Sequence, residues 1–186
     1  NGHAYQIEKV RQETGSDYVV IVMSGDFVQR GEPAVLDKYV RAHMALENGA
    51  DLVLELPVYY ALGSAEYFAS GAVALLDRLG VVDALCFGSE CGDIELLSKF
   101  ADCLSTENPL FQDTLKAHLK KGASYPAARS AALMASTPEL SESIKTLETP
   151  NNILAIEYCK ALRKRKSTIT PCTIRRAGAG YHETGT

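Results

Sequence analysis

The chain has 186 residues, 46% of them hydrophobic, and a formal net charge of −4. This length and apolar content suffice for one well-cored α/β domain, or for such a domain with a small helical appendage. The acidic balance argues against a general nucleic-acid coat protein, although it leaves room for a local basic patch. We expect no DNA partner, and no membrane partner either, because no apolar run approaches the ~20 residues of a bilayer span.

The cysteines and histidines show no spacing typical of a metal site. The chain contains five cysteines and four histidines: Cys86, Cys91, Cys103, Cys159, Cys172, His3, His43, His118 and His182. The cysteine number is odd and no Cys-x-x-Cys pair occurs, which predicts neither a disulfide framework nor a zinc site. We therefore expect a cytoplasmic protein whose side chains build no metal centre.

The first three residues, Asn1-Gly2-His3, open a helical pattern. A glycine beside a histidine at a helix start lets a polyanion approach free backbone N–H groups, where the helix dipole also favours negative charge. A nucleotide phosphate suits that geometry, and a histidine that donates to its non-bridging oxygens can assist phosphoryl chemistry without becoming a nucleophile. A helix start capped by Asn1 is the plainer interpretation of so short a motif.

Helices and strands alternate over the next part of the chain. Continuous apolar runs are typical of strands buried on both faces of a parallel sheet, and they occur at residues 18–23, 51–57 and 82–87. Helices are expected between them at residues 37–47, with Asp37 as the cap, and at residues 65–79, with Gly80 behind. This alternation predicts βαβ units. Because ligands bind beyond the carboxyl ends of parallel strands, residues 24–26 and 88–90 are candidate site segments, including the carboxylates of Asp26 and Glu90.

The remaining chain is mostly helical and returns to the sheet at its end. Helices are expected at residues 94–104, 109–119, 125–134 and 152–162, the last with Asn151 and Asn152 as natural N-cap residues. A strand at residues 168–174 leads into Arg175, Arg176 and a glycine-rich turn, which could hold a phosphate or form an ordinary loop. We divide the chain into a core at residues 1–92, a helical segment at 93–166, and a final strand and loop of the core at 167–186.

Taken together, these segments are similar to the tRNA(Met) cytidine acetate ligases, a branch of the HIGH-motif nucleotidyltransferase superfamily. Asn1-Gly2-His3 resembles the tail of the His-x-Gly-His motif. The other residues that carry the resemblance lie at 23–34, 87–90, 121–126 and 150–154, together with Arg176, Tyr181 and His182. They follow one another in order over nearly the whole chain, which makes the resemblance more specific than the short motif.

The resemblance implies a Rossmann-like parallel-sheet nucleotidyltransferase core with a helical insertion. It also implies an enzyme that uses ATP to activate acetate as acetyl-adenylate and then acetylates N4 of the wobble cytidine of elongator tRNA(Met). His3 would be catalytic, and the ATP-binding residues would be Asn1, Gly2, His3, Gly88, Asn151, Arg176 and Ala177. Mg²⁺ bridging the phosphates is expected, with no protein ligand assigned to it. The core's first strand and the first histidine of the motif are expected before Asn1, and a further Ser/Thr-rich segment ending in Arg after Thr186.

Contacts with tRNA would have to be concentrated in two basic stretches because the chain as a whole is acidic. These stretches consist of Lys120, Lys121, Arg163, Lys164, Arg165 and Lys166. Runs of this kind more commonly serve as solvated helix ends. Two other functions fit the opening motif: a nucleotidyltransferase for a small phosphorylated cofactor precursor, and a nucleotide-binding module without catalysis.

Overall fold

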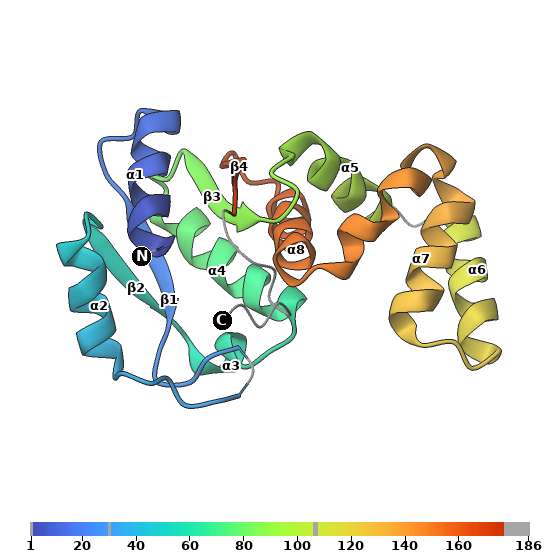
Figure 1. The fold of residues 1–186 in the computed structure, drawn as a ribbon, viewed down its shortest axis with the longest axis horizontal. Helices are drawn as coiled ribbons and strands as arrows, with labels where there is room; N and C mark the ends of the chain where they lie inside the picture. The colour runs from blue at the N-terminus through green and yellow to red at the C-terminus, as the bar shows by residue number, and fades with distance from the viewer. Residues whose placement is uncertain (1, 30, 106–107, 177–186) are drawn as a thin grey trace, which may run out of the picture.

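The computed structural model describes residues 2–29, 31–105 and 108–176, and its first half alternates helices with strands as predicted (Figure 1). The elements of this half are α1 (Gly2–Thr14), β1 (Val20–Ser24), α2 (Lys38–Glu47), β2 (Leu52–Leu56), α3 (Val58–Ala61), α4 (Ala65–Leu79) and β3 (Ala84–Ser89). The second half is helical until its final strand. It contains α5 (Ile94–Ser105), α6 (Pro109–Lys120), α7 (Tyr125–Ser136), the 3₁₀ helix η1 (Pro138–Glu148), α8 (Pro150–Arg165) and β4 (Thr170–Arg175).

The strands pair in parallel, which confirms the predicted α/β class. β1 pairs with β2, with Val20 opposite Leu52, and β3 pairs with β4, with Ala84 opposite Thr170. Among the described residues these are two separate two-stranded sheets, since no ladder joins β1 to β3. α1 runs upward in Figure 1 and β1 returns downward beside it, so the N-terminus of α1 points the same way as the carboxyl end of β1.

Short polar side chains set the helix starts in the first half. Asp37 accepts hydrogen bonds from the N–H groups of Tyr39 and Val40 at 2.9 Å each, which confirms its predicted role as the cap of α2. Asp26, a candidate site residue, accepts from the backbone N–H of Lys38 at 3.0 Å and so helps to order the same turn. Glycine sets the end of α4. This helix stops at Gly80, whose φ of 69° lies in the left-handed region that glycine adopts readily.

An ion pair ties α1 to the start of β2. Arg11 Nη2 lies 2.6 Å from Asp51 Oδ2, and the same carboxylate oxygen accepts from the N–H of Val19 at 2.7 Å. The hydrogen bond from the Val19 N–H lowers the pKa of Asp51, and the Arg11 guanidinium lowers it further. Desolvation opposes both effects, but the pKa stays below its ordinary value. These contacts fix the turn that carries the chain into β1.

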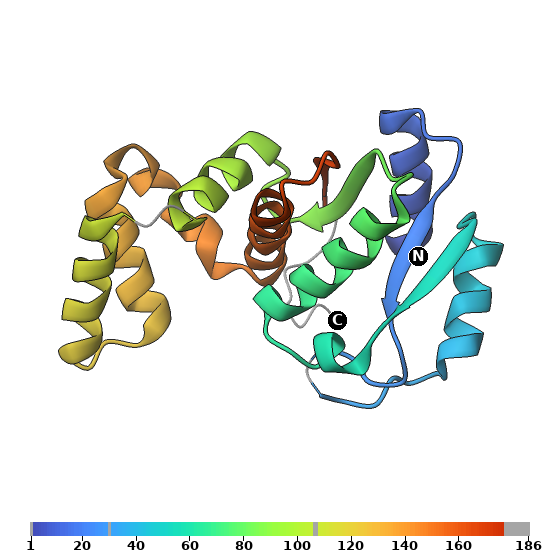
Figure 2. The same ribbon diagram turned by 180° about the vertical axis from the view of Figure 1, so that it is seen from behind.

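The largest hydrophobic core surrounds α8. This helix packs against α4 on one side and α5 on the other, and Figures 1 and 2 show it between them. Its buried neighbours include Phe87, Leu97, Phe100 and Leu133, three of which are fully buried. α6 and α7 pack on each other and lie at the end of the molecule farthest from β1 and β2. The division at residues 92/93 and 166/167 stays a prediction.

Three features differ from the sequence-based expectations. Residues 58–61 and 138–148 form short helices where none was predicted. The structure also joins Cys86 and Cys172 by a disulfide, so the prediction of no disulfide was wrong. These cysteines are direct register partners in β3 and β4, with Cα atoms 4.7 Å apart. Because they are 86 residues apart in the sequence, their contact cannot be predicted until the strand register is known.

Candidate nucleotide-binding site

The carboxyl ends of β3 and β4 meet the N-terminus of α8. β3 ends at Ser89 and leads directly into Glu90, while β4 ends at Arg175 and leads into Arg176. The parallel register places Ser89 opposite Arg175, so the residues that follow both strands lie at one edge of the sheet. This edge is where ligands bind in open parallel sheets. Of the predicted ATP-binding residues, the structure brings Gly88, Asn151 and Arg176 together here.

The Glu90 carboxylate caps α8 from outside the helix. Its Oε2 accepts from the backbone N–H of Asn152 at 2.8 Å, and its Oε1 accepts from Asn151 Nδ2 at 2.7 Å and from the Asn151 backbone N–H at 3.3 Å. Desolvation raises the pKa of Glu90, but the Asn151 amide and the nearby backbone N–H groups together outweigh it, so the pKa lies below its ordinary value. A charged carboxylate thus sits on the positive end of the α8 dipole.

Asn152 in turn accepts hydrogen bonds from the turn after β3. Its side chain is buried, and its Oδ1 accepts from the backbone N–H groups of Glu90 at 2.9 Å and Cys91 at 3.2 Å. The prediction that the asparagines cap their own helix was wrong. Pro150 occupies the first turn and Thr149 the cap position, with no side-chain cap hydrogen bond, so the asparagines fall inside the helix.

A pair of hydroxyls, from the buried Ser89 and the partly buried Thr173, holds the two strand ends together. Thr173 Oγ1 donates to the Phe87 carbonyl at 3.0 Å, so the hydrogen in its 2.7 Å contact with Ser89 comes from the Ser89 hydroxyl. Ser89 Oγ in turn accepts from the N–H of Gly92 at 3.0 Å, and the Ser89 side chain is fully buried. No pattern in the sequence predicts this arrangement, because the two hydroxyls are 84 residues apart.

Arg176 lies across the end of β3 beside Asn151. Its Nη1 donates to Asn151 Oδ1 at 3.5 Å. A Cβ added to Gly88 would lie 3.3 Å from Arg176 Cγ, so the glycine leaves space for the arginine side chain to lie close to the strand. Arg176 is exposed, and its guanidinium has the fork geometry that suits phosphate oxygens.

The opening motif lies on a different element from these residues. Gly2 and His3 form the start of α1, both are exposed, and α1 contacts β3. The helix begins at Gly2, as the motif predicted, and its N-terminal N–H groups are the kind that bind anions. Asn1 and Ala177, the remaining predicted ATP-binding residues, lie outside the described residues.

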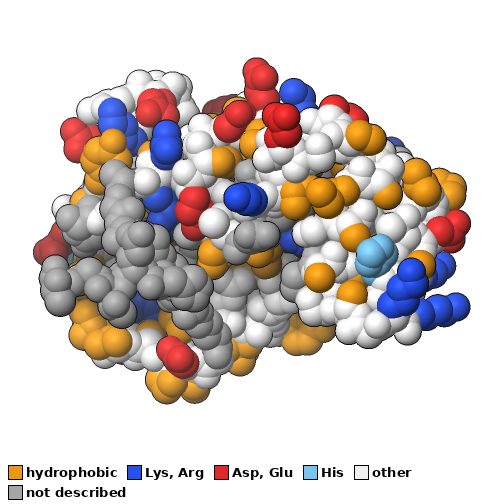
Figure 3. Space-filling model, turned by 45° about the vertical axis from the view of Figure 1, so that its right-hand side comes forward, with side chains coloured by type: hydrophobic (Ala, Val, Ile, Leu, Met, Phe, Trp, Pro, Cys, Tyr) orange, Lys and Arg blue, Asp and Glu red, His pale blue; other side chains and the backbone are white. Residues whose placement is uncertain are grey.

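The two basic stretches differ in how they are engaged. Arg163 donates from Nη2 to Asp102 at 2.9 Å, and Arg165 pairs with Asp77 at 3.1 Å, so both arginines make ion pairs within the fold. Lys120 and Lys121 end α6. Figure 3 shows Lys and Arg side chains gathered beside a histidine on the side of the molecule that α6 and α7 form.

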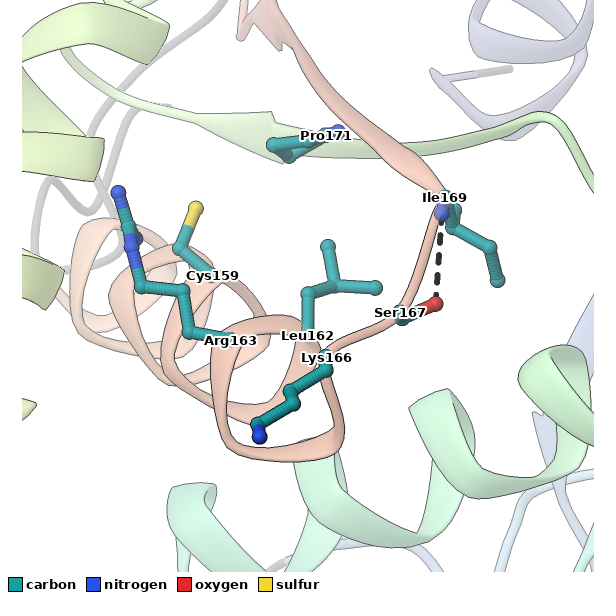
Figure 4. A pocket seen from close by; sticks show the side chains of 7 residues that line it. All are labelled: Cys159, Leu162, Arg163, Lys166, Ser167, Ile169 and Pro171. Carbon is teal, nitrogen blue, oxygen red and sulfur yellow. Dashed lines mark hydrogen bonds between the residues drawn. The ribbon is translucent and has the colours of Figure 1, made fainter.

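A pocket of about 210 Å³ opens between the last turns of α8 and the start of β4 (Figure 4). It is lined by Cys159, Leu162, Arg163, Lys166, Ser167, Ile169 and Pro171. Its walls come from the amino end of β4, whereas Glu90 and Arg176 follow the carboxyl ends of the strands. The pocket therefore contains none of the predicted ATP-binding residues.

Within residues 2–29, 31–105 and 108–176, no three His, Cys, Asp or Glu side chains converge as metal ligands would. Over the same residues, no helix combines the length and the apolar character that a membrane span requires. The site at the carboxyl ends of β3 and β4 contains the Arg176 guanidinium, whose fork geometry suits phosphate oxygens, beside the Asn151 amide and the carboxylate that caps α8.

Parallel strands alternating with helices, together with a helix α1 that starts at Gly2-His3 and contacts β3, define a protein with a Rossmann-like fold. A family model described as HIGH Nucleotidyl Transferase matches residues 1–186, and the chain belongs to that family. This confirms the predicted fold class and superfamily.

Within the family, the chain is similar to proteins named tRNA(Met) cytidine acetate ligase. The protein of that name from Caldanaerobacter subterraneus is 57% identical over 97% of this chain and 45% of its own length. The one from Acetivibrio thermocellus is 50% identical over 98% of this chain and 44% of its own length. The chain thus spans about 45% of the length of these curated relatives.

Solved structures match the fold closely. The apo form I structure of Thermotoga maritima TmcAL superposes with a TM-score of 0.95 at 45% identity, over 100% of this chain and 45% of that chain. A second structure of the same protein, bound with alpha-thio ATP, gives a TM-score of 0.91 at 46% identity, over 96% of this chain and 44% of that chain.

Proposed function

We propose that this chain carries the nucleotide-binding part of an enzyme that activates acetate with ATP and acetylates elongator tRNA(Met). The observation that carries the proposal is the meeting of Asn151 and Arg176 with Gly88 at the carboxyl ends of β3 and β4. The similarity to a structure bound with an ATP analogue supports ATP as the ligand, and the names of the relatives support acetate and tRNA(Met) as the other substrates.

In the proposed first step, an acetate oxygen attacks the α-phosphorus of ATP in line with the leaving pyrophosphate, and acetyl-adenylate forms. Charge builds on the phosphate oxygens, and His3, the N-terminus of α1 behind it and Arg176 would stabilise that charge. Removing one such donor usually costs ~10²–10³ in rate. In the second step, N4 of the wobble cytidine attacks the acyl carbon and AMP leaves, which mainly requires that the two groups be held in place.

The residues proposed to bind ATP are those of the opening motif and of the β3–β4 edge: Asn1, Gly2, His3, Gly88, Asn151, Arg176 and Ala177. Mg²⁺ would enter with the ATP phosphates and neutralise part of their charge. We assign no residue to the ion, because no cluster of ligating side chains occurs among the described residues.

For tRNA, the exposed lysines are better candidates than the arginines of the second stretch. Arg163 and Arg165 already pair with aspartates, whereas Lys120 and Lys121 stand at the tip of the α6–α7 hairpin, where they can meet a phosphate backbone. Lys164 and Lys166 at the end of α8 are also exposed and complete the proposed set. Such contacts would weaken steeply with salt. A cytoplasmic location, where tRNA is modified, belongs to the same proposal.

The test is acetate-dependent exchange of labelled pyrophosphate into ATP by the full-length protein. His3→Ala is expected to lower the exchange rate by about 10²-fold, as the loss of one donor to the phosphates would. The matched control is His43→Ala, because His43 is an exposed histidine of α2 whose partner is Glu47 on the same helix. No exchange with acetate or related acids would refute the ligase and favour a cofactor nucleotidyltransferase or a binding module without catalysis.

A further inference from the structure

Glu90 is connected to the proposed ATP site through one amide. Its Oε1 accepts from Asn151 Nδ2 at 2.7 Å, and the other end of the same amide, Oδ1, faces Arg176 Nη1 at 3.5 Å. An amide side chain can otherwise rotate to exchange its oxygen and nitrogen positions. The carboxylate removes that freedom because it can only accept hydrogen bonds, so the nitrogen must face Glu90 and the oxygen must face Arg176.

Glu90 also decides what the N-terminus of α8 can bind. The first N–H groups of a helix commonly cradle a phosphate. Here the N–H groups of Asn151 and Asn152 already donate to the Glu90 carboxylate. The end of α8 therefore offers a ligand the oriented Asn151 oxygen and the Arg176 guanidinium, rather than an open anion cradle.

Asn152 makes this arrangement rigid. Its buried Oδ1 accepts from the N–H groups of Glu90 and Cys91, so the turn that carries Glu90 is itself tied to α8. The Glu90 backbone and carboxylate are thus both anchored on the first turn of that helix. Little movement is left for the Asn151 amide while these hydrogen bonds stand.

We propose that Glu90 is a positioning residue for nucleotide binding: it orients the Asn151 amide so that its oxygen faces Arg176 and the ligand. This inference rests on the proposed function only as far as ATP is the ligand of the site. It assigns Glu90 no contact with ATP. Its effect passes through Asn151, which gives it a signature that a purely structural role lacks.

The experiment measures the Kd of ATP, without acetate, for the full-length protein and its variants. Glu90→Gln is expected to weaken ATP binding about tenfold, because its amide can no longer accept from every neighbour that the carboxylate serves. Asn151→Ala is expected to have a similar effect. The double variant is expected to match Asn151→Ala alone, since residues that act through one contact are not additive.

The matched control is Asp37→Asn. Asp37 caps α2 through two backbone N–H groups, as Glu90 caps α8, but it lies outside the proposed site. We expect Asp37→Asn to remove the charge from the N-terminus of α2 at a small cost in cap stability, because asparagine still accepts at the cap, and to keep the ATP Kd within about twofold of wild type. An equal loss of ATP affinity in Asp37→Asn and Glu90→Gln would mean that cap stability alone explains the effect, and the inference would fail.

A second variant covers the case in which Glu90→Gln does not fold. Glu90→Asp keeps the charge on the α8 dipole but withdraws the oxygen from the Asn151 amide by one methylene, so it should bind ATP more weakly at a smaller cost in stability. An unchanged Kd in the folded Glu90 variants, or a double variant whose effects multiply to about a hundredfold, would overturn the inference. Wild-type protein that binds no ATP would overturn it together with the proposed function, whereas ATP binding without acetate-dependent exchange would refute the ligase alone.

Discussion

Replacing Asn152 with alanine tests how the site is held together. The Asn152 side chain is only 2% exposed, and its Oδ1 accepts two backbone N–H groups, from Glu90 and Cys91. Each donor left without an acceptor in such a place costs about 1–3 kcal/mol. Alanine returns about 0.5 kcal/mol through its higher helix propensity. With two donors affected, the net loss in the free energy of unfolding is therefore expected to be about 1.5–5.5 kcal/mol.

Urea unfolding monitored by circular dichroism measures this loss. The control is Asn48→Ala, which removes one exposed hydrogen bond, from Nδ2 to the Met44 carbonyl at 2.7 Å, and should change stability by about 0.5 kcal/mol or less. The dependence on urea should keep its slope in both variants, because the same surface is exposed on unfolding. A loss below about 1 kcal/mol for Asn152→Ala would show that water replaces the missing acceptor, and our account of a rigid turn would be refuted.

Three further predictions concern single contacts of the fold. Gly92→Ala should lower the free energy of unfolding by about 2 kcal/mol or more, as measured by thermal unfolding, because φ is +65° and the new Cβ would lie 2.6 Å from Arg175 Cβ. The control is Gly15→Ala, where φ is +64° but the space is open, and it should cost only about 1 kcal/mol. The stability that Asp51 adds through its lowered pKa is complete above its ordinary value of 3.8 and is lost as the pH falls through the folded value, so Asp51→Asn should flatten the acid limb of urea midpoints. Cys172→Ser removes a link across 86 residues and should cost about 4–5 kcal/mol; thiol titration of the unfolded wild type should find three free thiols, and five would contradict the disulfide.

Sequence reasoning performed well where structure is local. Asp37 was recognisable as a helix start, and it caps its helix in the structure. The continuous apolar runs identified the strands, although most residues of β1 and β2 are not buried as predicted, and β3 extends two residues beyond the expected end, to Ser89. These features depend on contacts within a few residues, which a single sequence displays directly.

The errors arose where the partner is distant in sequence. Asn151 and Asn152 have the composition of an N-cap, yet Pro150 sets the start of α8 and the cap comes from Glu90, 61 residues before Asn151. The Cys86–Cys172 disulfide was not predicted for the same reason, since it depends on strand register. Of the candidate site, the resemblance supplied Gly88, Asn151 and Arg176 as members, but only the structure shows what orients them.

The hydrogen bonds between Glu90 and α8 hold together the two ends of the helical segment that is inserted between β3 and α8. Residues 91–149 leave the sheet after Glu90 and return at Pro150, so the two ends of this segment must be brought together before the site can form. Glu90 and Asn152 do this reciprocally, each accepting a backbone N–H from the other residue. Because closure of a long loop costs entropy that grows only slowly with its length, such a clamp tolerates changes in the inserted helices. Changes at the exposed residues of α6 and α7, which lie outside the core around α8, should therefore affect what the hairpin contacts and leave the positions of Asn151 and Arg176 unaltered.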